Sequence, residues 1–281
     1  MKEKRLLRPW QGIIMIILAA VEVFIISGYL SGMFGLYGAA INELILLALG
    51  LGTTALSGAD LKAVFQFRKP KMTEVFGTLV LWLGCYFFTL MITMIVTFFF
   101  PQEMTEVGTG LSQMFTSVPF LISVFIVSLM PAVCEEVLFR GAFFNSVWNG
   151  IHKKWPVILI VSVVFGIFHG SIWRFIPTCI LGIAMGYLMF ETNNMFCNML
   201  FHAVNNAVPL FLLYGMQAVL HATGMEQVLA EAETTASEIS AAVVGVDIVW
   251  GLVGIFLIYI GNYLLHAGKP GYTKEIFNFR K

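Results

Sequence analysis

The chain has 281 residues, of which 59% are hydrophobic and 11% charged, and its mean hydropathy is +0.87. A soluble domain of this length needs far more polar surface, so this composition excludes one. The formal net charge is zero, which gives no reason to expect nucleic-acid binding. Residues 1–281 are therefore predicted to form a single integral membrane domain, all-α and polytopic.

The apolar stretches separate into eight membrane-spanning segments when they are read with a window of about 20 residues. In chain order these are Gln11–Leu30, Gly35–Leu56, Thr73–Phe100, Val118–Trp148, Pro156–Gly170, Phe175–Phe190, Met195–Leu220 and Val244–His266. The fifth and sixth segments are short, and a tight hairpin around residues 171–174 would join them. Residues 221–240, rich in Ala, Glu and Thr, predict either a short surface helix or a mobile loop.

The basic residues test this count, because cytoplasmic loops collect Lys and Arg. With eight segments, 14 of the 16 basic residues fall on one side, while Arg140 lies inside a segment and Arg174 lies on the other side. The 14 residues occur before the first segment, after the second, after the fourth and after the eighth. Both termini are therefore predicted to be cytoplasmic.

Polar residues interrupt three neighbouring apolar segments. Ionisable side chains cost several kcal/mol in hydrocarbon unless they are paired or hydrated, so their presence indicates a function. The three clusters are Glu135, Glu136 and Arg140; His169; and His202 with Asn205 and Asn206.

In the first cluster, the adjacent residues Glu135 and Glu136 are predicted to have different surroundings. Glu136 and Arg140 are four residues apart, so they share a helix face and are expected to pair. Glu135 is rotated about 100° away and is freer to face a cavity. One carboxylate can thus be held by Arg140 while the other acts as a base.

The second and third clusters supply imidazole and amide groups. Phe165 lies one turn before His169, while His202 and Asn206 share a helix face that Asn198 extends. A glutamate, two histidines and an asparagine on three helices are the groups needed to activate water and stabilise an oxyanion. Together they predict a hydrolytic site.

Structural interpretations compete with this one. An intramembrane histidine can serve hydrogen bonding alone, and the Glu136–Arg140 pair can be structural even within an active site. Glu22, and Asn42 with Glu43, are further intramembrane polar residues that fit no motif, and a proton path in a transporter would use such groups. Cys134 adjoins Glu135, but a buried cysteine is usually an inert small hydrophobe.

The three clusters also carry a resemblance. EEVLFR reads as EExxxR, FGIFH as FxxxH and HAVNN as HxxxN, in this order and on successive membrane segments. The chain resembles the CPBP family of intramembrane proteases, which includes eukaryotic CAAX prenyl endopeptidases and bacterial bacteriocin-processing or self-immunity proteins. The resemblance covers residues 118–215.

The resemblance implies a role for each motif residue. Glu135 would be the principal base, and His169 would position or deprotonate the water. His202 and Asn206 would stabilise the oxyanion, while Glu136 and Arg140 would support the site.

The cofactor is either absent or one zinc ion. Glu135, His169 and His202 could supply three ligands from three helices, the number that a catalytic zinc uses, and Glu136 would then be the remaining base. The same residues also suffice without metal. The resemblance to the CAAX endopeptidases favours the metal-free mechanism.

These observations predict an endopeptidase of a bacterial cytoplasmic membrane that cleaves a membrane-embedded or lipid-associated peptide or protein. A pheromone or bacteriocin precursor, a membrane regulator and a lipid-modified tail are the substrates considered. A non-catalytic immunity or regulatory protein would instead function without Glu135, and a transporter would depend on Glu22 or Glu43.

Helix rise also predicts where the site lies across the membrane. Glu135 is expected near the cytoplasmic end of its segment, and His202 about 10 Å deep. His169 would lie about 20 Å deep if its helix began at the interface, so the fifth segment is expected to protrude into the cytoplasm.

Overall fold

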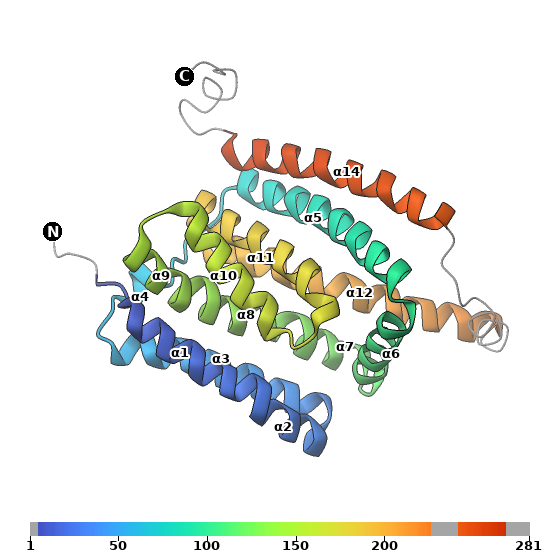
Figure 1. Cartoon of the computed structure of the whole chain (residues 1–281), viewed down its shortest axis with the longest axis horizontal. Helices are drawn as coiled ribbons and strands as arrows, with labels where there is room; N and C mark the ends of the chain where they lie inside the picture. The colour runs from blue at the N-terminus through green and yellow to red at the C-terminus, as the bar shows by residue number, and fades with distance from the viewer. Residues whose placement is uncertain (1–4, 226–240, 268–281) are drawn as a thin grey trace.

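A computed structural model describes residues 5–225 and 241–267, which are almost entirely helical (Figure 1). Three short π-helical segments, η1 to η3, continue neighbouring α-helices. In order the elements are α1 (Pro9–Val21), η1 (Glu22–Ile26), α2 (Ser27–Phe34), α3 (Leu36–Leu56), α4 (Leu61–Val64), α5 (Met72–Phe99), α6 (Pro101–Thr116), α7 (Phe120–Ser123), η2 (Val124–Leu129), α8 (Met130–Glu136), η3 (Val137–Phe143), α9 (Phe144–Ile151), α10 (Lys154–Phe168), α11 (Ile172–Thr192), α12 (Met195–Thr223) and α14 (Ala241–His266).

The helices confirm a polytopic all-α membrane protein. Within the described ranges, seven helical stretches are long and apolar enough to cross a bilayer, and α10 is a shorter apolar helix of 15 residues. Helix α10 and α11 form the predicted hairpin, with its turn at residues 169–171. Helix α6 was not predicted, and most of the predicted surface helix or loop at 221–240 lies outside the described residues.

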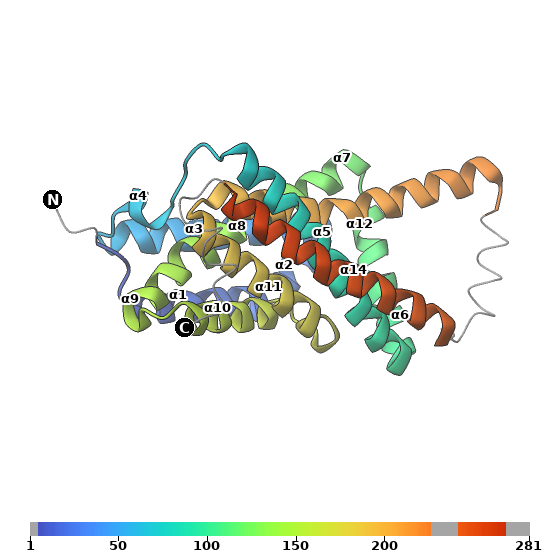
Figure 2. The ribbon, with the colours of Figure 1, turned by 90° about the horizontal axis from the view of Figure 1, so that it is seen from above.

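The helices form three groups (Figures 1 and 2). Helices α1 to α3 lie along one side of the molecule, α5 and α14 along the other, and α8 to α12 between them. The starts of α1 and α4 and the α9–α10 turn lie at one end of the bundle, so the predicted basic loops there share an end. That this end faces the cytoplasm remains a prediction.

Glycines allow the closest helix contacts. Gly84 of α5 packs so tightly on α14 that a Cβ atom there would lie 2.6 Å from the backbone nitrogen of Ile258. Gly35, with a φ of 57°, makes the turn between α2 and α3, and Asn42 Nδ2 donates a hydrogen bond to Ser27 Oγ across the two helices at 2.8 Å. The outer helices are therefore fixed firmly against their neighbours.

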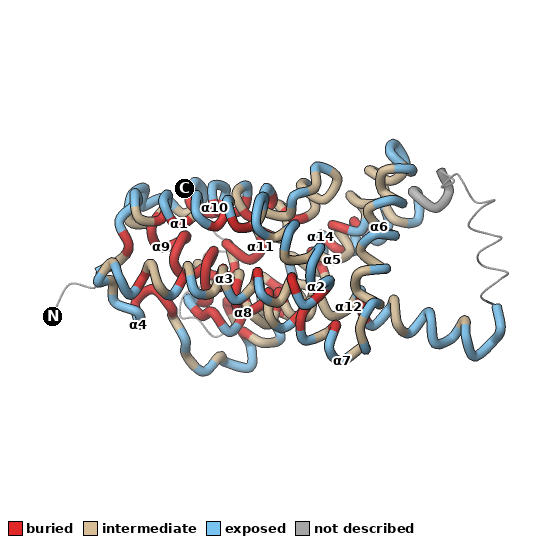
Figure 3. Tube along the Cα trace, turned by 90° about the horizontal axis from the view of Figure 1, so that it is seen from below, coloured by how far each residue is buried: buried red, intermediate tan, exposed pale blue. Residues whose placement is uncertain are grey.

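The fourth span is the centre of the core. It runs from Phe120 to Ile151 and contains the π-helical segments η2 and η3, and every residue of η3 is buried. Figure 3 shows buried residues concentrated between α1, α3 and α8 to α11. Because π-helical turns insert an extra residue and often mark functional sites, the break immediately after Glu136 is consistent with a special role for this region.

Helix α12 begins deep inside the protein. Met195 is fully buried, and its backbone N–H donates to Gln66 O at 3.0 Å in the segment before α5. The side chain of Met195 packs beside Gly141, because a Cβ atom on Gly141 would lie 3.7 Å from Met195 Cε. Gly141 is ten residues before Ile151, the end of the fourth span. Ten residues of helix correspond to about 15 Å. The start of α12 thus lies about 15 Å along the bundle from the end at Ile151. The expected protrusion of the fifth segment stays a prediction.

Candidate active site

A buried ion pair lies at the end of α8. Arg140 Nη1 donates to Glu136 Oε1 at 2.9 Å, and both side chains have no exposed surface. His202 Nδ1 is also 2.9 Å from Glu136 Oε1, and Asn198 Nδ2 lies 3.5 Å from Glu136 Oε2. One carboxylate therefore joins the fourth span to α12 through charged hydrogen bonds, as the four-residue spacing predicted for Arg140.

Glu135 has different surroundings from its neighbour. Its side chain is 17% exposed, and Oε2 lies 3.9 Å from His202 Nε2. This oxygen receives no hydrogen bond within the described residues. Because the two carboxylates diverge on the helix, His202 bridges them, with Nδ1 facing Glu136 and Nε2 facing Glu135.

His169 caps the C-terminal end of α10, where its orientation is set by the backbone. Nδ1 lies 2.9 Å from Phe165 O, the position for donating a hydrogen bond, which leaves Nε2 as an acceptor in the neutral ring. The Phe165 ring packs edge-on to both His169 and His202, at centroid distances of 4.8 and 6.0 Å. It also lies 4.2 Å below the Arg140 guanidinium. The phenylalanine of the FxxxH motif thus contacts residues of all three motifs.

Glu135 and His169 line the same small cavity of about 70 Å³. The other lining side chains are apolar: Val23, Leu46, Phe139 and Phe168. A water molecule occupies about 30 Å³ and needs polar partners, so the cavity has room for about two waters between the carboxylate and the imidazole. Water held there would lie within reach of both groups.

Asn206 lies one turn beyond His202 on α12. Its Nδ2 donates to Val127 O at 3.1 Å, and its Oδ1 accepts from Asn205 Nδ2 at 3.2 Å. One of its two amide hydrogens remains available for another acceptor. Asn205 and Arg174 line a separate groove of about 320 Å³ between α5, α6, α11 and α12, so this groove adjoins the asparagine of the HxxxN motif.

The residues do not fit a metal site. Within the described ranges, no three His, Cys, Asp or Glu side chains are arranged so that they could hold a metal ion together. The predicted ligands Glu135, His169 and His202 do not form such a group.

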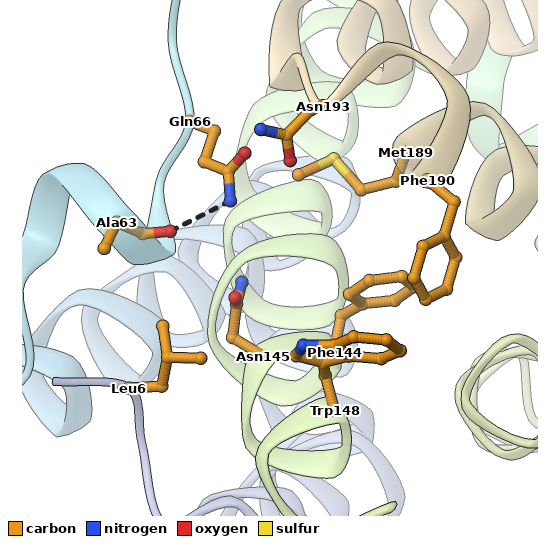
Figure 4. Close-up of a pocket in the computed structure, with 9 residues that line it drawn as sticks. All are labelled: Leu6, Ala63, Gln66, Phe144, Asn145, Trp148, Met189, Phe190 and Asn193. Atoms are coloured by element: carbon orange, nitrogen blue, oxygen red, sulfur yellow. Dashed lines mark hydrogen bonds between the residues drawn. The ribbon is translucent and has the colours of Figure 1, made fainter. Parts of the chain in front are cut away.

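A further cavity at the end of the bundle near α4 contains none of the predicted site residues (Figure 4). It has a volume of about 340 Å³ and is lined by an aromatic wall and three amide side chains. Gln66 Nε2 donates to Ala63 O at its edge. The larger cavity is therefore distinct from the small one that holds Glu135 and His169.

Sequence reasoning did not connect two intramembrane carboxyl groups with the site. Glu43 lies one turn before Leu46 and Glu22 directly before Val23, and Leu46 and Val23 line the cavity that Glu135 and His169 share. Both are outside the three motifs, and the signal that pointed to them was an ionisable residue inside an apolar segment. That signal could not show that the helices carrying Glu22 and Glu43 pack beside the helices that carry the motifs.

Comparison with known proteins agrees with the motifs. A family model described as type II CAAX prenyl endopeptidase Rce1-like matches residues 117–208. UPF0177 protein YxdF of Lactococcus lactis subsp. lactis (strain IL1403) is 31% identical over 133 residues, covering 45% of this chain and 73% of that protein. No solved structure gives a significant match.

The matched residues contain all three motifs, and the surrounding helices are those of a multi-pass membrane protein. A bacterial cell membrane is consistent with the bacterial relative. The predicted family is confirmed: the chain belongs to the CPBP family, among the proteins described as type II CAAX prenyl endopeptidase Rce1-like.

Proposed function

We propose that the protein is an intramembrane endopeptidase that hydrolyses a peptide bond of a membrane-associated protein or peptide. The observation that carries this proposal is the position of Glu135, which faces His202 Nε2 across 3.9 Å and shares a cavity with His169. A carboxylate without a donor, beside an imidazole and room for water, is the arrangement that general-base catalysis requires.

The first chemical step activates water. Glu135 takes a proton from a water in the shared cavity, and His169 Nε2 orients that water as an acceptor. The water oxygen forms a bond to the scissile carbonyl carbon, and the carbonyl electrons move to its oxygen. Catalysis by a positioned base of this kind contributes on the order of 10² to 10⁴ in rate.

The second step needs donors for the oxyanion. His202 Nδ1 lies 2.9 Å from Glu136 Oε1, and Nε2 on the other side of the ring would donate to the oxyanion with the ring in its doubly protonated form. Asn206 supplies the remaining amide hydrogen one turn away. When the C–N bond breaks, Glu135 returns its proton to the leaving nitrogen, which gives one carboxylic acid and one amine.

The supporting pair acts through position. Arg140 neutralises Glu136, and Glu136 in turn fixes the imidazole of His202. Glu136 and Arg140 are therefore assigned to support and Glu135 to the base.

The groove lined by Asn205 and Arg174 is the proposed path of the substrate. Its walls are largely apolar and come from four helices, which suits a membrane-embedded or lipid-associated segment. Peptide precursors, membrane regulators and lipid-modified tails all offer such segments.

The test compares membrane peptides from cells that express the unchanged protein, Glu135→Ala, Glu135→Gln or Glu106→Gln. Glu106 is an exposed carboxylate on α6, so its variant is the matched control. Cleavage products should disappear in both Glu135 variants and persist in the control, at equal amounts of inserted protein. Products unaffected by loss of Glu135 would overturn the proposal and favour a non-catalytic immunity or regulatory role.

A further inference from the structure

Arg174 is a cation that the proposed chemistry leaves without a role. It lies in the first turn of α11 and is partly buried, and no residue in the described ranges forms an ion pair or a side-chain hydrogen bond with its guanidinium. The other arginines that are partly or fully buried, Arg68 and Arg140, each pair with a glutamate, at 2.5 and 2.9 Å. The eight-segment topology also singles out Arg174, because it is the basic residue on the side opposite the other 14.

Arg174 is recessed within the bundle. The helix before it, α10, has 15 residues and is about 22 Å long, whereas the fourth span has 32 residues and is about 48 Å long. The turn between α10 and α11 therefore ends near the middle of the bundle, and Arg174 follows directly after it (Figure 1). A cation in hydrocarbon costs several kcal/mol unless it is hydrated or paired, so this guanidinium needs water or an anion.

The surroundings of Arg174 are a groove of about 320 Å³ between α5, α6, α11 and α12. Among the described residues that line this groove, Arg174 is the only charged one, and the rest are apolar, aromatic, hydroxyl or amide residues. Phe100, directly before α6, packs on Trp173 at a centroid distance of 4.6 Å and so holds α6 beside the start of α11 (Figures 1 and 2). The groove therefore presents a single positive charge to a molecule that enters it.

The groove leads to the catalytic residues. Asn205 lines it on α12, and Asn205 Nδ2 donates to Asn206 Oδ1 at 3.2 Å. On α11 the lining continues from Arg174 to Leu181, about two turns of helix. A peptide segment that fills the groove thus has one residue beside Arg174 and others beside Asn205 and Leu181. The group that meets the guanidinium then belongs to a side chain within that segment.

We propose that Arg174 is a specificity-determining residue, which binds the carboxylate of an aspartate or glutamate side chain in the substrate segment that occupies the groove. This inference rests on the proposed peptidase function and narrows its substrate class. A guanidinium offers a carboxylate two parallel N–H donors, and in a largely apolar groove each charge compensates the other for the water that it loses. A segment with only apolar side chains leaves Arg174 desolvated and unpaired, so it binds less tightly.

Binding can be measured without turnover. Protein that carries Glu135→Gln, and so lacks the proposed base, is purified in detergent and titrated with fluorescent peptides. The peptides have about 20 leucine and alanine residues with one glutamate or one glutamine at the centre. The glutamate peptide should bind on the order of 10- to 100-fold more tightly than the glutamine peptide, the ratio expected for a hydrogen bond between charged groups.

Three variants in the same background assign this preference to Arg174. Arg174→Gln should bind the two peptides equally, and Arg174→Lys should keep a smaller preference, because an ammonium group lacks the planar pair of donors. Arg5→Gln removes an exposed arginine elsewhere on the chain and should keep the full preference. Because each ratio compares two peptides on one protein, a loss of folded protein alone does not change it.

Kinetics give a readout that a structural role would not. On a peptide whose cleavage requires Glu135, Arg174→Gln should raise KM by on the order of 10- to 100-fold and leave kcat nearly unchanged, because the contact is away from the reacting carbonyl. Replacing the acidic residue of that peptide by its amide should have the same effect. The two changes together should add little to either one alone.

Equal binding of the glutamate and glutamine peptides, or a preference that survives Arg174→Gln, would overturn the inference. Two further arms identify another anion. Tighter binding of a glutamine peptide with a free C-terminus than of its amidated form would assign Arg174 to a chain end, and loss of the glutamate preference on adding phosphatidylglycerol would assign it to a lipid phosphate; either result overturns the side-chain assignment. If no Glu135-dependent cleavage exists, the peptidase proposal fails by itself, and the binding comparison still decides whether Arg174 selects a carboxylate.

Discussion

Removal of the Glu136 carboxylate should destabilise the protein strongly. In Glu136→Ala, Arg140 loses its 2.9 Å ion pair while its guanidinium stays fully buried. His202 Nδ1 and Asn198 Nδ2 lose the same carboxylate. The remaining hydrogen bonds of Arg140 are weak, since Nη2 lies 3.5 Å from Gly182 O and Nε has no partner.

The expected cost follows from the unpaired charge. Breaking a buried ion pair by removing one partner costs about 3 to 5 kcal/mol of unfolding free energy. At about 2 to 4 °C per kcal/mol for large domains, the unfolding temperature should fall by about 6 to 20 °C. Glu136→Leu combined with Arg140→Met removes both charges and keeps apolar volume, so it should recover most of this loss.

The cysteines provide the assay. Cys85, Cys134 and Cys197 are buried and free, so a thiol-reactive fluorescent dye reports unfolding of the detergent-solubilised protein. Glu106→Gln, on the exposed surface of α6, is the control and should leave the unfolding temperature unchanged. A Glu136→Ala protein within about 1 kcal/mol of the unchanged protein, or a double variant worse than the single, would refute the argument from buried charge.

Two further results are expected. Asn206→Ala should lower the cleavage rate by about 10² to 10³ if its amide holds the oxyanion, with insertion into the membrane unchanged, and a loss of less than tenfold would remove Asn206 from that role. Chelator treatment should leave cleavage intact, and metal analysis should find no stoichiometric zinc; zinc lost together with activity would replace the metal-free mechanism.

The sequence predicts those features that depend on local spacing. Hydrophobic length predicts the spans, and the four-residue interval from Glu136 to Arg140 predicts their pairing, because both are properties of a single helix. The motifs also predict the family. That Glu135, His169 and His202 would share one site followed from the resemblance, and helix periodicity alone could not bring three helices together.

The features that were missed depend on tertiary packing. Helix α6 is too polar for a window that searches for membrane spans, although its apolar side lines the groove beside Arg174. Leu46 of α3 and Glu135 line one cavity although they are 89 positions apart, and no local pattern encodes this proximity. The sequence placed the start of α12 at the membrane surface. The segment before α5, whose Gln66 contacts Met195, is not apolar enough for hydropathy to reveal that it packs there.

The helix bounds also give a second expectation for the depth of the site. Glu135 does not lie near the end of its span, because 15 residues separate it from Phe120 and 16 from Ile151. These intervals correspond to about 22 and 24 Å of helix. His169 is 15 residues from the start of α10 at Lys154, again about 22 Å from the same end. Glu135 and His169, on two different helices, therefore lie at about the same distance from this end of the bundle.

Cleavage is therefore expected near the middle of the membrane. The fourth span is about 48 Å long and the hydrocarbon core about 30 Å thick, so a span centred on the bilayer places Glu135 at the midplane. Mass spectrometry of the products from a model substrate with a single membrane span would locate the cleaved bond. A bond in the outermost helical turn at either edge would show that the span is not centred or that Glu135 is not the base. Cleavage at the centre would require water to reach the cavity between Glu135 and His169, which is where the structure leaves room for it.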